Sequence, residues 1–308
     1  MIILLSHMLI LNYKSMSSIS IISFNILASV YASPDYYPDE CAPYLDTSNR
    51  SIVINKFLFN CNYDIIGLQE VTQTEYAILM ATLDNKYTSC FFPHDETYCN
   101  EWMDPENTQP NGNAIFLANA MFKDTIWSDI RLASGNHVVS CLTNTISNIK
   151  LRITNIHLDG DDMECRRKEY LELLDQLSFD PDMIDIVLGD FNDGLILIDI
   201  AKQYPIRASA TGRNDGYHFK DAINSVLTYS MAGAAKTKQP IDHITYRYGK
   251  DLTVTASVLD KNMWIDYPVL NEHDPLCGPR CCMCLELYGS DHIPVAATLN
   301  ILLSERVL

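Results

Sequence analysis

The sequence predicts a single α/β domain, on the strength of three observations. Short apolar, β-branched runs alternate along the chain with segments of helical periodicity. Apolar residues make up 47% of the 308 positions and charged residues 20%, which is enough to bury a sizeable core. No internal repeat, low-complexity tract or Gly/Ser/Pro-rich linker divides the chain. We therefore expect one catalytic domain over residues 17–303, with an N-terminal extension over 1–16 and a C-terminal tail over 304–308.

The first half of the chain contains alternating strands and helices. The run ISIISFNILA at 19–28 is β-branched and apolar, which predicts a buried strand. A Ser/Asn cap precedes a predicted helix over 48–60. A short buried strand over 64–69 leads to a second helix over 73–84, and a further strand is predicted at 114–118. This succession favours sheets that are covered by helices.

The second half begins with two strands, over 138–145 and 150–158, which a Ser-Asn turn joins as a pair. The segment 164–177 is an amphipathic helix, because its Tyr and Leu residues recur on one face. Another buried strand follows at 184–188 and runs into a Gly-Asp pair. The remaining strands are expected at 242–247, 253–259 and 293–299, and loops at 31–47, 88–112, 204–217, 228–240 and 266–290.

The charge of the chain limits its partners. Its 39 acidic residues outnumber 22 basic ones, which gives a formal net charge of −17. A generally basic surface that binds polyanions is therefore excluded, and any nucleic acid must bind at a local site where metal ions offset the carboxylates. No run of 18 apolar residues exists, so no membrane span is predicted.

The start of the chain and its cysteines bear on the compartment. Residues 1–14 contain an apolar run of about ten residues but lack a basic n-region and a small-residue cleavage site, so an upstream extension before Met16 is favoured over a secretory signal. Six of the ten cysteines are scattered without a repeated spacing, which is typical of reduced, buried side chains. We expect an intracellular, cytoplasmic protein.

Polar residues fall at the ends of the apolar strands, which is the most informative feature of the sequence. Burial of a carboxylate or amide is costly unless it is partnered, and five such placements indicate convergence at one end of packed sheets. Oxygen ligands of this kind suit Mg²⁺ or Mn²⁺ better than zinc, and histidines and acids beside such an ion fit hydrolysis of a phosphate ester. The residues concerned are Asn25, Glu70, His157, Asp190 with Asn192, and Asp291 with His292.

Six segments in order resemble the endonuclease/exonuclease/phosphatase superfamily: SFNILA, IIGLQEV, ITNIHLD, LGDFND, IDHITY and GSDHIPVAATL. They span roughly residues 19–300. The resemblance implies a four-layer α/β sandwich in which two mixed β-sheets lie face to face between helices. The opening FNILASVYA, the Cys41-Ala42-Pro43 loop and Arg50 resemble the CCR4-type branch, which contains deadenylases, nocturnin, angel proteins and 2′,5′-phosphodiesterases. The loop before Asp242 resembles that branch less.

The resemblance implies a role for each of these residues. Asn25, Glu70 and Asp291 would bind the metal, and Asp291 would alternatively orient His292. Arg166, which also fits the branch, is expected to contact substrate. Contact is further expected from Asn113 and from Arg213, whose basic side chain could touch phosphate or belong to a solvated loop. The catalytic set is Asp190 as the base that activates water, Asn192 and His157 as phosphate contacts, His292 as the group that stabilises developing charge, and Asp242 at the leaving group.

The residues at the strand ends also have purely structural alternatives. Glu70 and Asn25 are compatible with a helix cap and a turn, and Asp190 with Asn192 is compatible with an Asx-turn. Ser290-Asp291-His292 is compatible with an N-terminal turn. His157 is compatible with a satisfied rim histidine.

A cluster of cysteines, Cys277, Cys281, Cys282 and Cys284, follows His273. Clustered thiols can bind zinc, but this spacing matches no standard finger or ribbon. A reduced Cys-rich loop is favoured over a structural zinc site.

The substrate class stays open at this stage. The leading hypothesis is a Mg²⁺-dependent phosphodiesterase that acts on single-stranded RNA as a 3′ exonuclease. Net acidity favours the alternative of a phosphatase or phosphodiesterase on a small phosphate ester. A DNA endonuclease of the same superfamily is a further alternative. A catalytically silent scaffold is disfavoured, because the full set of polar strand-end residues is present.

Overall fold

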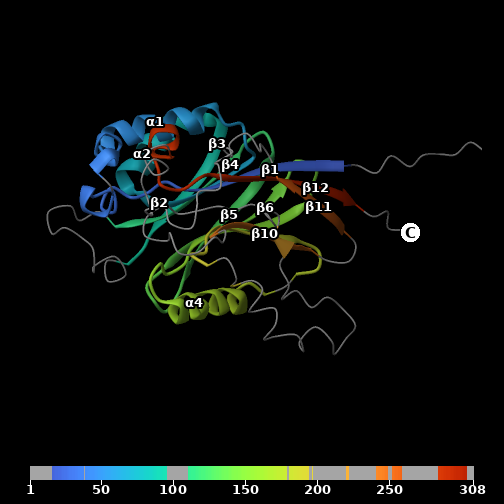
Figure 1. The fold of residues 1–308 in the computed structure, drawn as a ribbon. Helices are drawn as coiled ribbons and strands as arrows, with labels where there is room; N and C mark the ends of the chain where they lie inside the picture. Colours follow the sequence, from blue (N-terminus) through green and yellow to red (C-terminus); the bar gives the residue numbers. More distant parts are fainter. Residues whose placement is uncertain are drawn as a thin grey trace, which may run out of the picture.

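In the computed structural model the chain forms two β-sheets that lie face to face, with helices on the two outer faces (Figure 1). This arrangement confirms the predicted four-layer α/β sandwich. The structure describes residues 16–37, 39–95, 110–178, 180–193, 196, 220–221, 241–248, 252–258 and 284–303. None of the helices described in these ranges is long and apolar enough to cross a membrane.

The first sheet has the strand order β11-β12-β1-β2-β4-β3. Near its centre β1 and β2 run parallel, and helix α1 (Thr47–Asn60) forms the crossover between them. The strands are β1 (Met16–Asn25), β2 (Ile65–Thr72), β3 (Tyr87–Pro93), β4 (Asn111–Ala118), β11 (Leu252–Val258) and β12 (Val295–Leu303).

The second sheet has the order β5-β6-β7-β8-β10-β9 and repeats this plan. Its parallel pair is β7 and β8, and α4 (Met163–Gln176) forms the crossover. The strands are β5 (Phe122–Arg131), β6 (His137–Thr145), β7 (Lys150–His157), β8 (Ile184–Asp190), β9 (Lys220–Asp221) and β10 (Asp242–Tyr248). Each sheet thus brings the carboxyl ends of two parallel strands to one edge.

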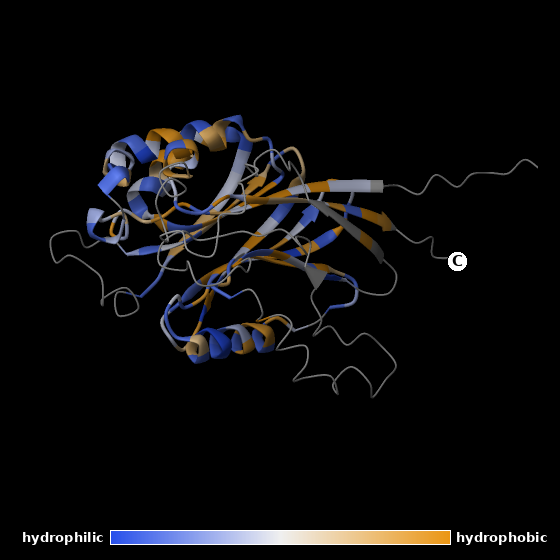
Figure 2. Ribbon diagram, in the orientation of Figure 1, coloured by the Kyte–Doolittle hydropathy of each residue, from blue (hydrophilic) through white to orange (hydrophobic). Residues whose placement is uncertain are grey.

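Three hydrophobic clusters hold the layers together. Alternate residues of the strands, such as Ile21 and Ile186, meet between the two sheets. The opposite face of the first sheet packs on α1 and on α2 (Gln73–Leu83), while that of the second packs on α4. In Figure 2 the outer helices carry both polar and apolar residues. Because neighbouring strand residues point to opposite faces, alternate residues of each strand face the other sheet and the rest face the helices.

The structure corrects several sequence-based boundaries. Residues 87–93 form β3, although a loop was expected from 88, and β5 was not anticipated because its alternate residues are polar or half-exposed. β1 begins at Met16, the last residue assigned to the extension. Within the expected loop 31–47 lie two 3₁₀ turns, Pro34–Tyr36 and Asp39–Tyr44, and a short helix covers 284–288 in the last expected loop.

Candidate active site

The candidate site lies where the two parallel strand pairs end. Asn25 closes β1, and Glu70 lies near the end of β2 in the first sheet. His157 closes β7, and Asp190 closes β8 in the second sheet. The amide nitrogen of Asn25 donates to both Glu70 Oε1 (2.7 Å) and Asp190 Oδ2 (3.0 Å), so one side chain joins the two sheets.

A β-bulge turns Glu70 into the site. The register of β2 against β4 shifts between Leu68 and Val71, and both of these residues pack toward the helices. Strict alternation would place residue 70 on the same face as Leu68. Instead Glu70 has a left-handed backbone, with φ of 58°, and its carboxylate faces Asn25. A non-glycine residue in this conformation costs about 1–3 kcal/mol, which is typical of functional positions.

Asp190 lies at the centre of the group. Its Oδ2 atom is 3.5 Å from His292 Nε2 and 3.8 Å from His157 Nε2, in addition to the bond from Asn25. The preceding Gly189 has φ of 144°, and a Cβ atom there would lie 1.9 Å from the carbonyl oxygen of Ile156. Glycine is therefore required at this position for β8 to bring Asp190 beside β7.

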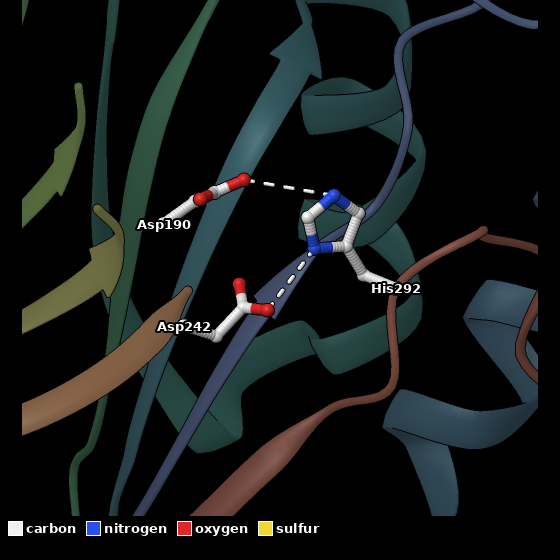
Figure 3. A group of neighbouring side chains, drawn as sticks. All are labelled: Asp190, Asp242 and His292. Carbon is white, nitrogen blue, oxygen red and sulfur yellow. Dashed lines mark hydrogen bonds and ion pairs between the residues drawn. The ribbon is translucent and has the colours of Figure 1, made fainter. Parts of the chain in front are cut away.

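Asp242 and His292 complete the buried group (Figure 3). The Nδ1 atom of His292 lies 3.1 Å from Asp242 Oδ2, while Nε2 faces Asp190. Burial lowers the pKa of His292, but the carboxylates of Asp242 and Asp190 more than offset this and raise that pKa well above its usual value. Burial also raises the pKa of Asp242. The imidazole thus favours its charged form between two acids.

Asp291 has different neighbours. The hydroxyl group of Tyr37 donates to its Oδ2 atom at 3.2 Å, and burial raises the pKa of Tyr37, with a further increase from Asp291. Arg50 lies nearby on α1 and donates to the main-chain carbonyls of Ile26, Leu27 and Gly289. The carboxylate bonded to His292 Nδ1 is that of Asp242. An orienting role of Asp291 toward His292 stays a prediction.

The donor set fits a divalent cation. Ligand atoms of Asp190, Asp242 and His292 lie within 4.8 Å of one another, and all three residues are buried. Glu70 adds a further carboxylate 4.0 Å from His157. Carboxylate oxygens gathered in this way repel one another unless a cation is present, and oxygen-rich sites suit Mg²⁺ or Mn²⁺. The buried Asp/Asp/His group is therefore suited to hold a metal.

The other predicted site residues have main-chain partners. Asn192 follows Asp190 in an Asx-turn, and its amide nitrogen donates to the carbonyl of Leu158 at 2.9 Å. Arg166 donates to the carbonyls of Asp159 and Gly160. Asn113 Nδ2 donates to the carbonyl of His137 at 2.9 Å. Contact of these three side chains with substrate stays a prediction, as do the metal roles of Asn25 and Asp291.

In this conformation Asn25 presents its amide nitrogen to the carboxylates of Glu70 and Asp190, while its side-chain oxygen accepts from the Leu27 main-chain amide.

Several predictions fall outside the described residues. They concern Arg213, the extension before Met16, the tail after 303, and most of the Cys-rich segment, of which only Cys284 is described.

Sequence reasoning missed three buried residues that support the site. Tyr37 contacts Asp291, while Gln69 and Asn155 bond to each other between the sheets, at 2.6 Å. A signal for Gln69 and Asn155 was present, because each amide continues a series of alternate positions that is otherwise without polar side chains, Ile65 and Gly67 before Gln69 and Leu151 and Ile153 before Asn155. Tyr37 lies in a polar loop and has no comparable signal.

Comparisons with known proteins agree with this geometry. The profile of the "Endonuclease/Exonuclease/phosphatase family" matches residues 22–292. A crystal structure of ANGEL2, described as a 2′,3′-cyclic phosphatase, is similar over 93% of this chain and 97% of its own, with 16% identity and a TM-score of 0.62. The human Nocturnin catalytic domain with bound sulfate is similar over 94% and 98%, with 19% identity and a TM-score of 0.58.

The structure of a mannosyl-6-phosphatase from Bacteroides thetaiotaomicron is similar over 91% of this chain and 99% of its own, with 17% identity and a TM-score of 0.55. No curated protein sequence matches significantly. ANGEL2 and Nocturnin bear the names of proteins in the branch that the opening motifs resemble, although identities this low establish the fold alone. The profile match spans most of the chain and includes Asn25, Glu70, Asp190 and His292. The chain therefore belongs to the endonuclease/exonuclease/phosphatase family, whose members are phosphoesterases.

Proposed function

We propose that this protein is a divalent-metal-dependent phosphodiesterase that removes nucleotides from the 3′ end of single-stranded RNA. The observation that carries the phosphoesterase part is the convergence of Glu70, Asp190 and Asp242 with two histidines at the edge of the sandwich. Buried acids of like charge are unfavourable for stability, so their presence together supports a catalytic role.

Glu70 would hold the metal together with the two carboxylates of the buried group, Asp190 and Asp242, while His292 keeps both of its nitrogens for Asp242 and the phosphate. Asn25 would fix the carboxylates of Glu70 and Asp190. A bound divalent cation supplies charge neutralisation at the phosphate and polarises its non-bridging oxygen. Mg²⁺ and Mn²⁺ are the ions that this donor set favours.

The side chains of the protein perform the remaining steps. Asp190 Oδ2 faces the centre of the site and accepts the proton of the attacking water. His292 donates from Nε2 to the phosphate oxygen that gains charge, because Asp242 holds Nδ1 and favours the charged ring. His157, beside Asp190 at the end of the neighbouring strand β7, donates to the same phosphate group. No covalent intermediate is needed, because the bond from phosphorus to the leaving oxygen breaks as the water oxygen adds, and the leaving oxygen takes its proton from solvent.

The choice of RNA rests on the resemblance of the opening segment to the CCR4-type branch, and the fold similarity to Nocturnin is consistent with it. A second candidate is a small phosphate ester. The net charge of −17 opposes a long polyanion, and the guanidinium groups of Arg50 and Arg166 are engaged with main-chain carbonyls. The similarity to a mannosyl-6-phosphatase is consistent with this second candidate.

A substrate panel separates these candidates. Poly(A), mixed single-stranded RNA, single-stranded DNA, abasic duplex DNA, 2′,5′-oligoadenylate, a 2′,3′-cyclic nucleotide and a sugar phosphate are each incubated with Mg²⁺, Mn²⁺ or EDTA. We expect RNA to be shortened from its 3′ end with either metal and to stay intact in EDTA. If the sugar phosphate is hydrolysed while the RNA stays intact, the small phosphate ester replaces RNA as the proposed substrate. Full activity in EDTA would exclude the metal mechanism.

A further inference from the structure

We propose that Asn155 is a positioning residue that fixes Glu70 in the site by filling the β2 bulge from the opposite sheet. Asn155 lies on β7 and is fully buried. This inference rests on the proposed function for its consequence at the metal, but the contacts that support it are independent of the substrate.

The amide of Asn155 is bonded at all three of its usual positions. Its Nδ2 atom donates to the carbonyl oxygens of Leu68 (2.7 Å) and Ala114 (2.9 Å), and its Oδ1 atom accepts from Gln69 Nε2 (2.6 Å). Leu68 and Ala114 are the last register pair of β2 and β4 before the bulge. Asn155 therefore bonds both strands of the first sheet at the point where their ladder is interrupted.

Two neighbouring contacts make this reach possible and reinforce it. At Gly67 a Cβ atom would lie 2.3 Å from Leu188 Cδ1 and 3.3 Å from Asn155 Cγ, so the missing side chain leaves room for the two sheets to approach. On the partner strand β4, Asn113 lies opposite the bulge. Its side-chain amide nitrogen donates to the carbonyl of His137, in the second sheet, at 2.9 Å. The two asparagines thus join the sheets in opposite directions at the bulge.

The bulge determines which way Glu70 points. Gln69 and Glu70 are consecutive, yet both face the second sheet: Gln69 bonds to Asn155, and the carboxylate of Glu70 lies 4.0 Å from His157. Residue 70 achieves this only with its left-handed backbone. Asn155 also lies two residues before His157 on the same face of β7, so it links the strand of His157 to the strand of Glu70. We infer that it maintains the 4.0 Å separation of these two side chains.

The test uses the full chain and two variants. Asn155→Leu keeps a similar volume but removes both donors and the acceptor. Gln69→Leu leaves the donors of Asn155 in place and removes the group that holds its oxygen, so it is the milder variant and decides the outcome if Asn155→Leu does not fold. The control is Thr245→Val, which removes a buried hydroxyl donor to the carbonyl of Val187 in the second sheet, away from β2. Thermal unfolding establishes the temperature at which all four proteins are folded.

Two readouts are compared at that temperature. Mn²⁺ affinity is measured by electron paramagnetic resonance, and hydrogen exchange of the amides from 68 to 72 is measured without metal. We expect Asn155→Leu to weaken Mn²⁺ binding by about 10–100-fold, the usual range for loss of a group that orients a metal ligand. Gln69→Leu should weaken it by a smaller factor. In both variants the hydrogen-exchange rate of the amides from 68 to 72 should rise more than that of the rest of the first sheet. The control Thr245→Val should stay within about twofold of wild type in both readouts.

The inference is overturned if the folded Asn155→Leu protein, or the folded Gln69→Leu protein in its place, binds Mn²⁺ like wild type. An equal loss in Thr245→Val would overturn it as well, because the effect would then be general destabilisation. If the wild-type protein itself binds no Mn²⁺, the proposed function fails, and the local exchange at 68–72 alone decides whether Asn155 holds the bulge.

Discussion

Strands β8 and β10 carry a pair of facing charged residues at each of their two ends. One pair consists of opposite charges and the other of like charges. At one end Asp185 lies opposite Arg247, and at the other Asp190 lies opposite Asp242. The first pair is an ion pair that faces α4, where Arg247 also donates to the carbonyl of Leu177. The second pair consists of two carboxylates that face the other sheet, with His292 against both.

The difference separates a structural end of the sheet from a functional one. Opposite charges directly across an antiparallel pair stabilise it, whereas like charges in that position destabilise it. Asp185 is compensated twice, because Arg152 binds it with two nitrogen atoms at 2.8 and 2.9 Å and Arg247 binds it as well. Asp190 and Asp242 share the single imidazolium of His292, so a further cation is needed to reach a comparable balance. A chain that keeps such an unfavourable pair buried retains it for chemistry.

The largest effect is expected from Asp185→Asn. This change leaves two guanidinium groups in a buried environment without their carboxylate, so we expect a loss of about 3–5 kcal/mol in the free energy of unfolding. Denaturant titration measures it. Turnover per folded molecule should be unchanged, because five strand residues, roughly 17 Å, separate the pair from the site. A loss below about 1 kcal/mol would show that this end is not held by the ion pairs.

The matched change at the other end, Asp190→Asn, should have the opposite profile. Turnover should fall by about 10²-fold or more, since the water loses its proton acceptor. The free energy of unfolding without metal should hold or rise, because the repulsion with Asp242 is removed. Steady-state kinetics and denaturant titration of the same preparations measure the two quantities. Near-normal turnover in a folded protein would exclude Asp190 as the base.

Metal binding sharpens the comparison further. At ten times its Kd a metal that binds only the folded state raises the free energy of unfolding by about 1.4 kcal/mol. We expect this increase with Mg²⁺ or Mn²⁺ in the wild-type protein and in Asp185→Asn. Asp190→Asn should gain much less at the same metal concentration. Equal stabilisation of all three proteins would place the metal elsewhere.

Apolar runs and polar interruptions are local signals, so they were sufficient for an α/β domain and for the strand-end residues, whereas the four-layer sandwich followed only from the resemblance to the family. Glu70, Asp190 and His292 were all identified as candidates in this way. The register between strands is not a local signal, so the direct opposition of Asp190 and Asp242 was not foreseen. The same holds for the choice of Asp242 as the partner of His292.

The bulge in β2 was also beyond the sequence pattern. An alternating run gives no indication of where one strand gains a residue, and the left-handed backbone of Glu70 contradicts the preference of a glutamate. Asn155 and Gln69 became interpretable only once the two sheets were placed face to face. Contacts between distant strands, rather than local propensity, therefore account for what was missed.

The smallest effect is expected at an exposed ion pair near the start of β7. Lys150 Nζ lies 3.0 Å from Asp180 Oδ2, and the two side chains are 47% and 35% exposed. Solvent screens such pairs, so Lys150→Ala should lower the free energy of unfolding by only about 0.2–1 kcal/mol at neutral pH. A loss comparable to that of Asp185→Asn would show that burial is not what separates the two ion pairs.

The pH dependence of the Lys150→Ala effect gives a second check. The pKa of Asp180 is lowered chiefly by the bond from the Asp182 main-chain amide and secondarily by Lys150. A carboxylate with a lowered pKa contributes stability that is present above its unfolded pKa, about 3.9, and is lost as the pH falls through the folded value. The difference between wild type and Lys150→Ala should therefore be constant from pH 5 to 7 and vanish once the pH has fallen below the folded pKa of Asp180. Because the Asp182 amide remains, most of the acid-induced loss should persist in the variant, which denaturant titrations at each pH would detect.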